Sequence, residues 1–310
     1  MGLGKNSDER KVLLAYLCVC IVWGSTYLAI RIGVSEFPPA LFAGIRFVVA
    51  GILMLWFARY KGLVFPQTII EVRRVAIVGL FLLAGGNGFV VWAEQWVHSG
   101  VASLLVATVP LFMATLELFL PEGKNIGKKG WMGLLLGFAG VMLLVFTHSG
   151  SGAIDLKGAA ILLMGTFLWS VGSVYAKTFK ASGSIITHIG IEMLTGGIVL
   201  SCVGVLLGES SKLHVTQKGI GAILYLIFFG SILAYSCYIY ILQKWPAAKA
   251  GTYAYVNPPV AVLLGSLVLD EPFTIQVVVS TLIILFGVFL VQTSKTSASQ
   301  RQNKETAEQS

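Results

Sequence analysis

Charged residues are scarce in this chain. Asp, Glu, Lys and Arg make up 12% of its 310 residues, whereas hydrophobic residues make up 56%. Ordinary soluble domains carry roughly 25% charged residues. A water-soluble protein of this length could not cover its surface with so few charges. The composition therefore excludes a soluble globular protein and predicts a chain that lies in a membrane.

Cysteine and histidine are also few, and their positions do not indicate a metal site or a catalytic site. The four cysteines all lie in apolar segments and the four histidines are scattered: Cys18, Cys20, Cys202, Cys237, His98, His148, His188 and His214. This pattern excludes a secreted disulfide framework and the usual zinc spacings, so the cysteines are interpreted as small apolar residues. No GxSxG motif occurs and no His is followed by Glu, which disfavours a membrane-embedded enzyme. No catalytic residue, metal site or cofactor is predicted.

Long apolar runs are what the sequence does contain. About 20 apolar residues cross the hydrocarbon core of a bilayer as a helix. The first run is too long for a signal peptide and lacks a small-residue cleavage site, so it is retained as a span. The sequence predicts an all-α integral membrane protein with ten transmembrane helices, near 12–31, 38–58, 75–96, 99–120, 130–147, 156–176, 185–208, 219–242, 248–269 and 274–293.

The chain also contains an internal duplication. A shift of 146 residues places Trp23 on Trp169, and a shift of 149 places Trp96 on Trp245. Further matches are Arg31 with Lys177, Pro110 with Pro259, Leu120 with Leu269, Glu122 with Glu271, and Gly140-Val141 with Gly287-Val288. Five spans per copy is an odd number, so the second copy must cross the membrane in the opposite sense. The pattern predicts two inverted five-helix repeats, with a binding site where they meet.

The cations predict the orientation of the chain. The net charge of +8 does not indicate nucleic-acid binding, because the cations lie in short gaps between apolar runs. With the N-terminus inside, the outer segments hold only Arg31, Lys157, Lys212 and Lys218, and the inner segments hold every other Lys or Arg except the intramembrane Arg46. This bias predicts that both termini are cytoplasmic. The predicted regions are a cytoplasmic N-terminus (1–11), a first repeat (12–147), a second repeat (156–293) and a disordered cytoplasmic tail (294–310).

Several motifs together resemble one family. They are Trp23-Gly24-Ser25, Gly44-Ile45-Arg46-Phe47, Pro110 with Glu122, Asn257-Pro258-Pro259, and Leu269-Asp270-Glu271-Pro272. With the ten spans and the duplication, they are similar to the EamA-type members of the drug/metabolite transporter superfamily. The resemblance runs from about Lys11 to Gln292 and implies a multi-pass carrier of the inner or plasma membrane. It also implies a central cavity lined mainly by the predicted helices 1, 3, 4, 6, 8 and 9.

Aromatic and polar residues inside the spans are candidates for this cavity. A carrier of small organic solutes needs aromatic surface with a few hydrogen-bonding groups. The alternative for tryptophan near a span end is an interfacial anchor, which is the favoured interpretation for Trp96 and Trp245. The residues predicted to line a substrate pathway are Trp23, Tyr27, Asn87, Trp92, Thr108, Trp169, Tyr175, Tyr235, Tyr238, Tyr253 and Asn257.

Proline, glycine and buried charge add further expectations. Pro110, Pro258 and Pro259 are predicted to kink their helices. Glycines 85, 86 and 88 are expected to loosen a helix at the pathway, with close helix packing as the alternative. The pair Gly133 and Gly137 is expected to allow close helix packing.

The intramembrane charges are Arg46, Glu94 and Glu192. Arg46 is expected to reach Glu94, and Glu192 to reach Lys244 or Gln243, as clamps between helices. Glu117 is expected to meet water. As an alternative to the clamp, Glu192 is a candidate for binding and releasing a coupling proton.

The predicted function is a secondary active transporter, with export of amino acids or amphipathic drug-like compounds as the leading version. A channel-like facilitator remains an alternative, and a membrane-embedded enzyme is a weaker one. The expected partners are a small-molecule substrate, the lipid bilayer and protons as a coupling ion, without nucleic acid. Assembly as a homodimer is left open.

Overall fold

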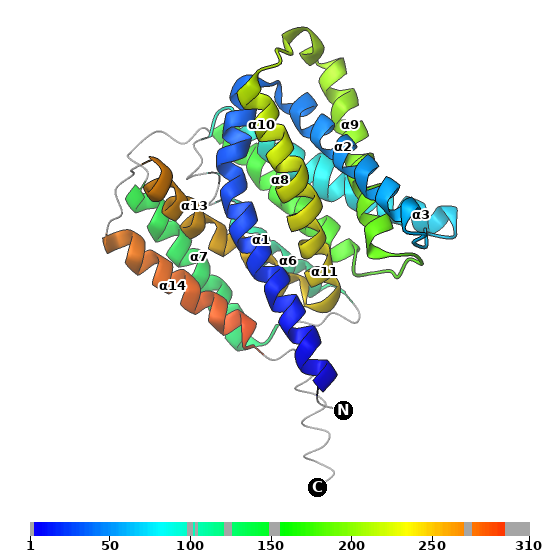
Figure 1. The fold of residues 1–310 in the computed structure, drawn as a ribbon. Coiled ribbons are helices and arrows are strands. Elements are labelled where there is room, and N and C mark those ends of the chain that lie inside the picture. Colours follow the sequence, from blue (N-terminus) through cyan, green and yellow to red (C-terminus); the bar gives the residue numbers. More distant parts are fainter. Residues whose placement is uncertain are drawn as a thin grey trace.

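The computed structural model describes residues 3–97, 102, 105–120, 126–148, 156–269 and 275–294. These residues form a helical bundle without a β-strand (Figure 1), which confirms the predicted all-α class. In chain order the helices are α1 (Leu3–Glu36), α2 (Pro39–Tyr60), α3 (Ile69–Gly79), η1 (Leu80–Asn87), α4 (Gly88–Ala93), α6 (Val109–Glu117), α7 (Lys128–His148), α8 (Leu156–Tyr175), α9 (Ile185–Leu206), η2 (Glu209–Lys212), α10 (Gln217–Tyr225), η3 (Leu226–Tyr235), α11 (Ser236–Lys244), α12 (Ala247–Gly251), α13 (Tyr253–Leu269) and α14 (Ile275–Gln292).

Six helices among the described residues are long and apolar enough to cross a membrane. They are Asp8–Glu36, Pro39–Tyr60, Ile69–Ala93, Leu156–Tyr175, Ile185–Leu206 and Gln217–Lys244, and each overlaps a predicted span. The predicted spans 99–120, 130–147, 248–269 and 274–293 correspond to α6, α7, α12 with α13, and α14. The membrane-spanning helical fold is therefore confirmed, and the count of ten stays a prediction. The motif residues Glu122, Asp270, Glu271 and Pro272, and the predicted tail beyond Ser294, lie outside the described residues.

Local capping signals set several helix starts. Thr68 Oγ1 accepts the N–H of Glu71 at 3.2 Å, and the Glu71 carboxylate accepts the N–H of Thr68 at 3.2 Å, which is a capping box before α3. Thr216 caps α10, the counterpart of α3 in the second half, by accepting the N–H of Gly219 at 3.0 Å. Corresponding helices in the two halves thus start with the same side-chain chemistry.

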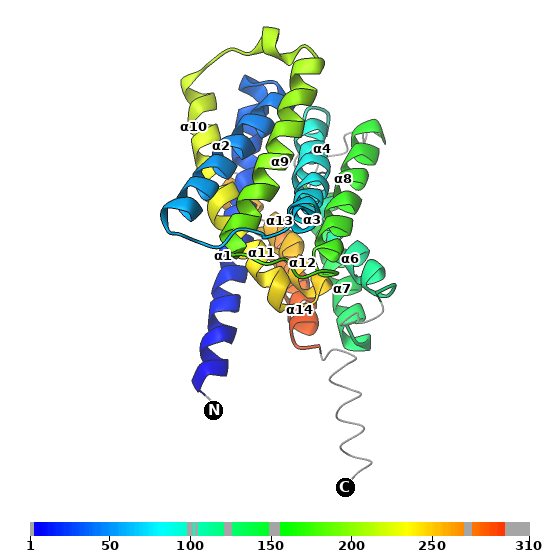
Figure 2. The ribbon, with the colours of Figure 1, turned by 90° about the vertical axis from the view of Figure 1, so that its right-hand side faces the viewer.

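The helices pack in pairs that correspond between the halves. The most extensive contacts join α2 to α9 and α7 to α14, which are equivalent helices of the two repeats (Figures 1 and 2). Helix α1 packs on α10, η3 and α11, and its counterpart α8 packs on η1 and α4. The start of α1 and the end of α14 lie at the same end of the bundle in both views, as an even number of spans requires. The assignment of that end to the cytoplasm remains a prediction.

Glycines allow two of these pairs to cross closely. A Cβ on Gly133 would lie 2.6 Å from the carbonyl oxygen of Gly287, and a Cβ on Gly287 would lie 2.5 Å from the backbone nitrogen of Gly137. The backbones of α7 and α14 therefore touch, as expected for small residues at a membrane helix interface. This contact bears out the packing interpretation of Gly133 and Gly137.

Candidate functional site

A cavity lies between helices of both halves. Its wall includes residues of α1, η1, α4, α6, α8, η3 and α13, which belong to the predicted helices 1, 3, 4, 6, 8 and 9. Helix α2 also contributes, through Arg46 and Phe47.

Most of the predicted pathway residues lie in this wall. The lining members are Trp23, Tyr27, Asn87, Trp169, Tyr235, Tyr253 and Asn257. The structure thus brings together residues that are up to 234 positions apart, from Trp23 to Asn257, in one space.

The other predicted pathway residues do not line the cavity. Trp92 is 39% exposed and packs against Phe89 and Trp96, because it lies on the outer face of α4. Tyr175 packs on Phe179 at the end of α8.

Thr108 donates to the carbonyl oxygen of Leu105 at 2.6 Å and lies 3.3 Å from the hydroxyl of Thr166, which does line the cavity. Tyr238 is fully buried behind Trp169. These residues belong to the neighbouring packing and not to the wall.

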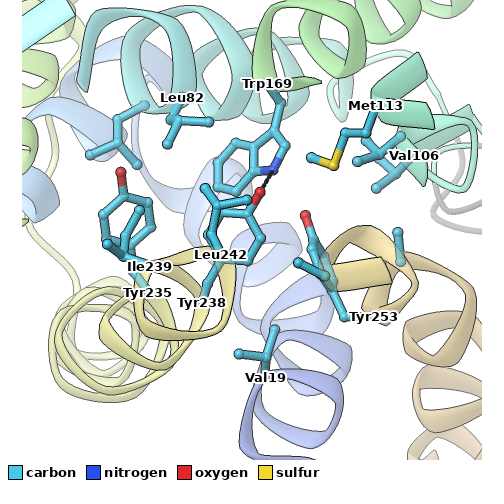
Figure 3. Packing of buried hydrophobic residues seen from close by; sticks show 14 of the residues in the cluster. Val19, Leu82, Val106, Met113, Trp169, Tyr235, Tyr238, Ile239, Leu242 and Tyr253 are labelled. Carbon is cyan, nitrogen blue, oxygen red and sulfur yellow. Dashed lines mark hydrogen bonds between the residues drawn. The ribbon is translucent and has the colours of Figure 1, made fainter. Parts of the chain in front are cut away.

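Four aromatic side chains, Trp23, Trp169, Tyr238 and Tyr253, pack together at one side of the cavity and are called the aromatic cluster. The Trp23 ring lies 5.5 Å from Trp169, 5.3 Å from Tyr238 and 4.8 Å from Tyr253, between centroids. Figure 3 shows the Trp169 indole bonded to Tyr238, with Nε1 donating to the hydroxyl at 3.2 Å. The same hydroxyl lies 2.6 Å from Ser173 Oγ, so the cluster is held by hydrogen bonds as well as ring contacts.

Both halves carry a π-helical segment beside the cavity. η1 widens the third predicted span and η3 widens the eighth, at equivalent places in the two repeats. Trp23 Nε1 donates to the carbonyl oxygen of Gly230 in η3 at 3.0 Å. A Cβ on Gly86 in η1 would lie 2.9 Å from the Trp169 ring. The expected loosening near glycines 85, 86 and 88 therefore takes the form of a π-helix, a feature frequent at functional sites.

Arg46 does not form the expected ion pair. Its side chain is buried, and Nε donates to Ser231 Oγ at 3.0 Å. Among the residues that the structure describes, neither carboxylate oxygen of Glu94 has a hydrogen-bond partner. Ser231 is the hydrogen-bond partner of Arg46 because η3, which contains Ser231, packs against α2. The spacing of residues in the sequence does not indicate this contact.

The expected partners of Glu192 were also wrong. Tyr235, which lines the cavity, donates its hydroxyl to Glu192 Oε2 at 2.9 Å. Glu192 is 4% exposed and lies in the middle of α9, whereas Lys244 lies at the end of α11. The structure thus connects this carboxyl group to the cavity through one tyrosine.

The expectation for Glu117 was wrong as well, and the three prolines occupy two different kinds of position. Glu117 is 1% exposed instead of meeting water, because it accepts the N–H groups of Ala247 at 2.6 Å and Ala248 at 3.1 Å at the start of α12. Pro110 lies in the first turn of α6, where its missing N–H removes no helical bond. The helix is interrupted just before it, at residues 107–108. Pro258 and Pro259 do lie inside α13, as the kink prediction requires.

Sequence reasoning missed several small residues at the site. Thr26, Thr166 and Gly230 line the cavity, and Ser231 holds Arg46. Thr166 could have been found, since it lies one helical turn from Trp169 on the same face. No comparable spacing in the sequence indicated that Ser231 belongs to the site.

The fold and cavity define a class: a multi-pass membrane protein of two similar halves with a cavity between them. The sequence profile of the EamA-like transporter family matches residues 10–146 and again 156–293. The chain therefore belongs to the EamA-like transporter family, within the drug/metabolite transporter superfamily.

Named relatives agree with this assignment, and a solved structure has the same fold. The chain is 40% identical over 283 residues to the Escherichia coli (strain K12) protein named uncharacterized inner membrane transporter YedA, covering 91% of this chain and 90% of that protein. It is 25% identical over 288 residues to the uncharacterized transporter YoaV of Bacillus subtilis (strain 168), covering 90% and 96%. A solved structure with 19% identity matches with a TM-score of 0.73 over 90% of this chain and 96% of its own, which shows the shared fold.

Proposed function

We propose that this protein is a secondary active transporter that exports small metabolites, either amino acids or amphipathic drug-like compounds, by alternating access. The observation that carries the proposal is the cavity between the halves, which has aromatic walls and is bounded on one side by the aromatic cluster. Such a wall binds the apolar body of a solute, and a few polar groups orient it.

The position of the aromatic cluster supports alternating access. In the predicted orientation, the lining residues Ile30, Val90 and Val106 lie toward the external ends of their predicted spans. In the aromatic cluster, Trp169, Tyr238 and Tyr253 lie toward the cytoplasmic ends of their helices, and Trp23 lies near the middle of α1. Beyond the cluster, Tyr16 bonds Thr252 at 2.9 Å and packs on Trp245 at 5.4 Å between centroids. Two layers of contacts therefore separate the cavity from that end, which favours a carrier over an open channel.

Protons are the proposed coupling ion. Glu192 is buried, and its only hydrogen-bond partner among the described residues is Tyr235, whose side chain reaches the cavity. A carboxyl group buried in this way can hold a proton in one conformation and release it when the cavity reaches water. No charged side chain of the described residues forms an ion pair with Glu192.

Transport by the purified protein in liposomes tests the proposal. Radiolabelled amino acids, nucleosides and cationic drugs should be supplied with and without a pH gradient, and Ile52→Ala, on an exposed face of α2, serves as the control variant. A carrier gives flux that saturates with solute concentration and rises with the gradient. Flux that increases linearly at all concentrations would identify a channel, and flux equal to empty liposomes for the whole panel would refute transport of these classes.

A further inference from the structure

The end of α2 carries two stacked aromatic side chains on its exposed face. Trp56 and Tyr60 are 66% and 74% exposed, and their rings lie 6.0 Å apart between centroids with an interplanar angle of 16°. Ile52, one turn earlier on the same face, is also exposed, whereas the opposite face of α2 packs on α9. The end of α2 lies at the edge of the bundle (Figures 1 and 2). An apolar face that ends in amphipathic rings is typical of a helix that faces lipid and reaches the head-group layer.

Two exposed cations lie beside the aromatic pair. Arg59 lies in the last turn of α2, and Lys61 follows its last residue. Lys61 Nζ lies 5.7 Å from the centroid of the Tyr60 ring, within the range of a cation–π contact. Neither Arg59 nor Lys61 forms an ion pair with a residue that the structure describes. The end of α2 therefore presents two positive charges without a bound anion.

The carboxylate nearest to these cations in the sequence already has other partners. Glu71 is the only acidic residue in the segment 59–74. It accepts the N–H groups of Gln67 at 2.9 Å, Thr68 at 3.2 Å and Ser182 at 3.0 Å, and the Ser182 hydroxyl donates to it at 2.6 Å. An anion for Arg59 and Lys61 must therefore come from outside this segment.

The chain that follows Lys61 is fixed against the second half of the protein. The carbonyl oxygen of Val64 accepts the N–H of Ser184 at 2.8 Å and the hydroxyl of Thr187 at 3.1 Å. A Cβ on Gly183 would lie 2.9 Å from the carbonyl carbon of Phe65, so the two connecting segments touch. Because the corner is ordered in advance, a ligand that binds there loses little free energy in ordering the chain.

The equivalent corner of the second half lacks the rings and the cations. A shift of 146 residues places the end of α2 on the end of α9, and the glycine after each helix has a positive φ, 62° at Gly62 and 72° at Gly208. The residues at the positions of Trp56, Arg59, Tyr60 and Lys61 are, in order, Cys202, Val205, Leu206 and Leu207. The same turn therefore forms without aromatic or charged side chains, so the fold does not require them at the end of α2.

We propose that the end of α2 binds the phosphate head group of an anionic phospholipid. Arg59 and Lys61 contact the phosphate, Trp56 and Tyr60 lie at the level of the ester groups, and the acyl chains lie along Ile52. Lys and Arg beside a bilayer attract anionic lipids, and a guanidinium group binds phosphate with paired hydrogen bonds. In the predicted orientation the lipid belongs to the cytoplasmic leaflet. The cations also contribute to that orientation, but orientation alone does not require the stacked rings.

Titration of the purified protein in detergent with two phospholipids tests the site. Dioleoylphosphatidylglycerol has an anionic head group, and dioleoylphosphatidylcholine has the same acyl chains and a zwitterionic head group. A ligand that binds the folded state raises the unfolding temperature. The anionic lipid is expected to act at a concentration about tenfold or more below that of the zwitterionic lipid, because each cation near the head group adds to the attraction. Inorganic phosphate is the third probe and should have no effect at these concentrations, because it lacks the acyl chains.

Matched variants assign the preference to the end of α2. Arg59→Gln combined with Lys61→Gln should make the two lipids equally effective. Lys212→Gln combined with Lys218→Gln, exposed in the equivalent connection of the second half, is the control and should keep the preference. If the first double variant does not fold, Lys61→Gln alone should lose part of the preference.

The aromatic pair has a different expected effect from the cations. Trp56→Leu combined with Tyr60→Leu should weaken both lipids and leave the ratio between them, because the rings contact parts that the two lipids share. Arg59→Lys combined with Lys61→Arg keeps both charges and should restore the preference for the anionic lipid. A loss of preference in this exchange variant would contradict binding through charge.

Three results would overturn the inference. They are an equal response of the unchanged protein to both lipids, a preference that survives removal of both cations, and a loss of preference in the control as large as in the first double variant. An effect of inorganic phosphate at the concentration of the anionic lipid would show a site for free anions, and would overturn the lipid assignment. All of these measurements are independent of transport, so the proposed function and this inference stand or fail separately.

Discussion

Glu117 and Lys177 bind opposite sides of one chain corner. The corner is formed by residues 245–246, which join the end of α11 to the start of α12. The Glu117 carboxylate accepts the N–H groups that open α12, and Lys177 Nζ donates to the carbonyl oxygens of Leu242 at 2.8 Å and Trp245 at 2.7 Å that close α11. An anion at a helix N-terminus and a cation at a helix C-terminus both favour the helix dipole. The two side chains therefore fix this corner from α6 and α8.

Glu117→Ala is expected to lower the free energy of unfolding by about 1–3 kcal/mol, because two buried N–H groups lose their acceptor. Glu117→Gln should cost less, since the amide oxygen still accepts one bond. The thermal unfolding midpoint in detergent measures the difference. Lys180→Met, exposed at the same end of the molecule, is the control. Midpoints equal to that of the unchanged protein would show that the corner does not depend on Glu117.

The sequence predicted the helices well because span length and apolar composition are local properties. The predicted span 38–58 and the observed α2 (Pro39–Tyr60) differ by only a few residues. The halves could also be compared by simple shifts, and Trp23 and Trp169 do meet in the cavity wall. The comparison of the two halves therefore predicted correctly that these two tryptophans lie at the cavity.

The contacts between helices could not be predicted in the same way. Arg46 bonds Ser231, Glu192 bonds Tyr235 and Glu117 bonds the start of α12, and each partner is at least 43 positions away. Charge complementarity suggested acidic and basic partners, but hydroxyl and backbone groups satisfy these side chains. The π-helices could not be predicted from the sequence either, because their hydrogen-bond pattern has no simple residue signature.

Trp23→Ala is expected to raise the half-saturating solute concentration by about tenfold or more. Tenfold corresponds to about 1.4 kcal/mol, which is less than the contact area of an indole ring usually contributes. Tyr238→Phe keeps the ring and removes only the hydroxyl that bonds Trp169 and Ser173, so its effect should be smaller. Saturation curves in liposomes at matched protein amounts give both values. If Ile52→Ala causes a loss as large as Trp23→Ala, the effect reflects folding and not solute contact.

Gly287→Ala is expected to destabilise the pair α7 and α14. Its Cβ would lie 2.5 Å from the Gly137 nitrogen and 2.7 Å from the Gly137 Cα, so the helices must separate. Overpacking of this kind costs about 1–3 kcal/mol. Gly221→Ala in α10 is the matched control, because its Cβ would meet nothing within 4 Å. The unfolding midpoint of Gly287→Ala should be lower than that of Gly221→Ala. A lower midpoint for Gly221→Ala would contradict the packing argument.

The predicted orientation can be tested with single cysteines on a background that lacks the native ones. Ser210→Cys, exposed in η2, should react with a membrane-impermeant maleimide in intact cells. Lys128→Cys, at the start of α7, should react only after the cells are opened. The reason is the excess of cations in the segments predicted to be cytoplasmic. Labelling of Lys128→Cys but not Ser210→Cys in intact cells would reverse the orientation.

Glu192→Gln is expected to abolish accumulation of solute driven by a pH gradient while downhill exchange continues. The amide keeps the size of the side chain and can still accept a hydrogen bond from Tyr235, but it cannot bind and release a proton. Tyr235→Phe removes that hydrogen bond and leaves the carboxyl group, so uphill transport should persist with a changed dependence on pH. Both variants are compared with the unchanged protein in liposomes, once with a pH step and once with solute on both sides. Accumulation by Glu192→Gln in response to the pH step would show that Glu192 only holds α9 against η3, and that the coupling ion binds elsewhere.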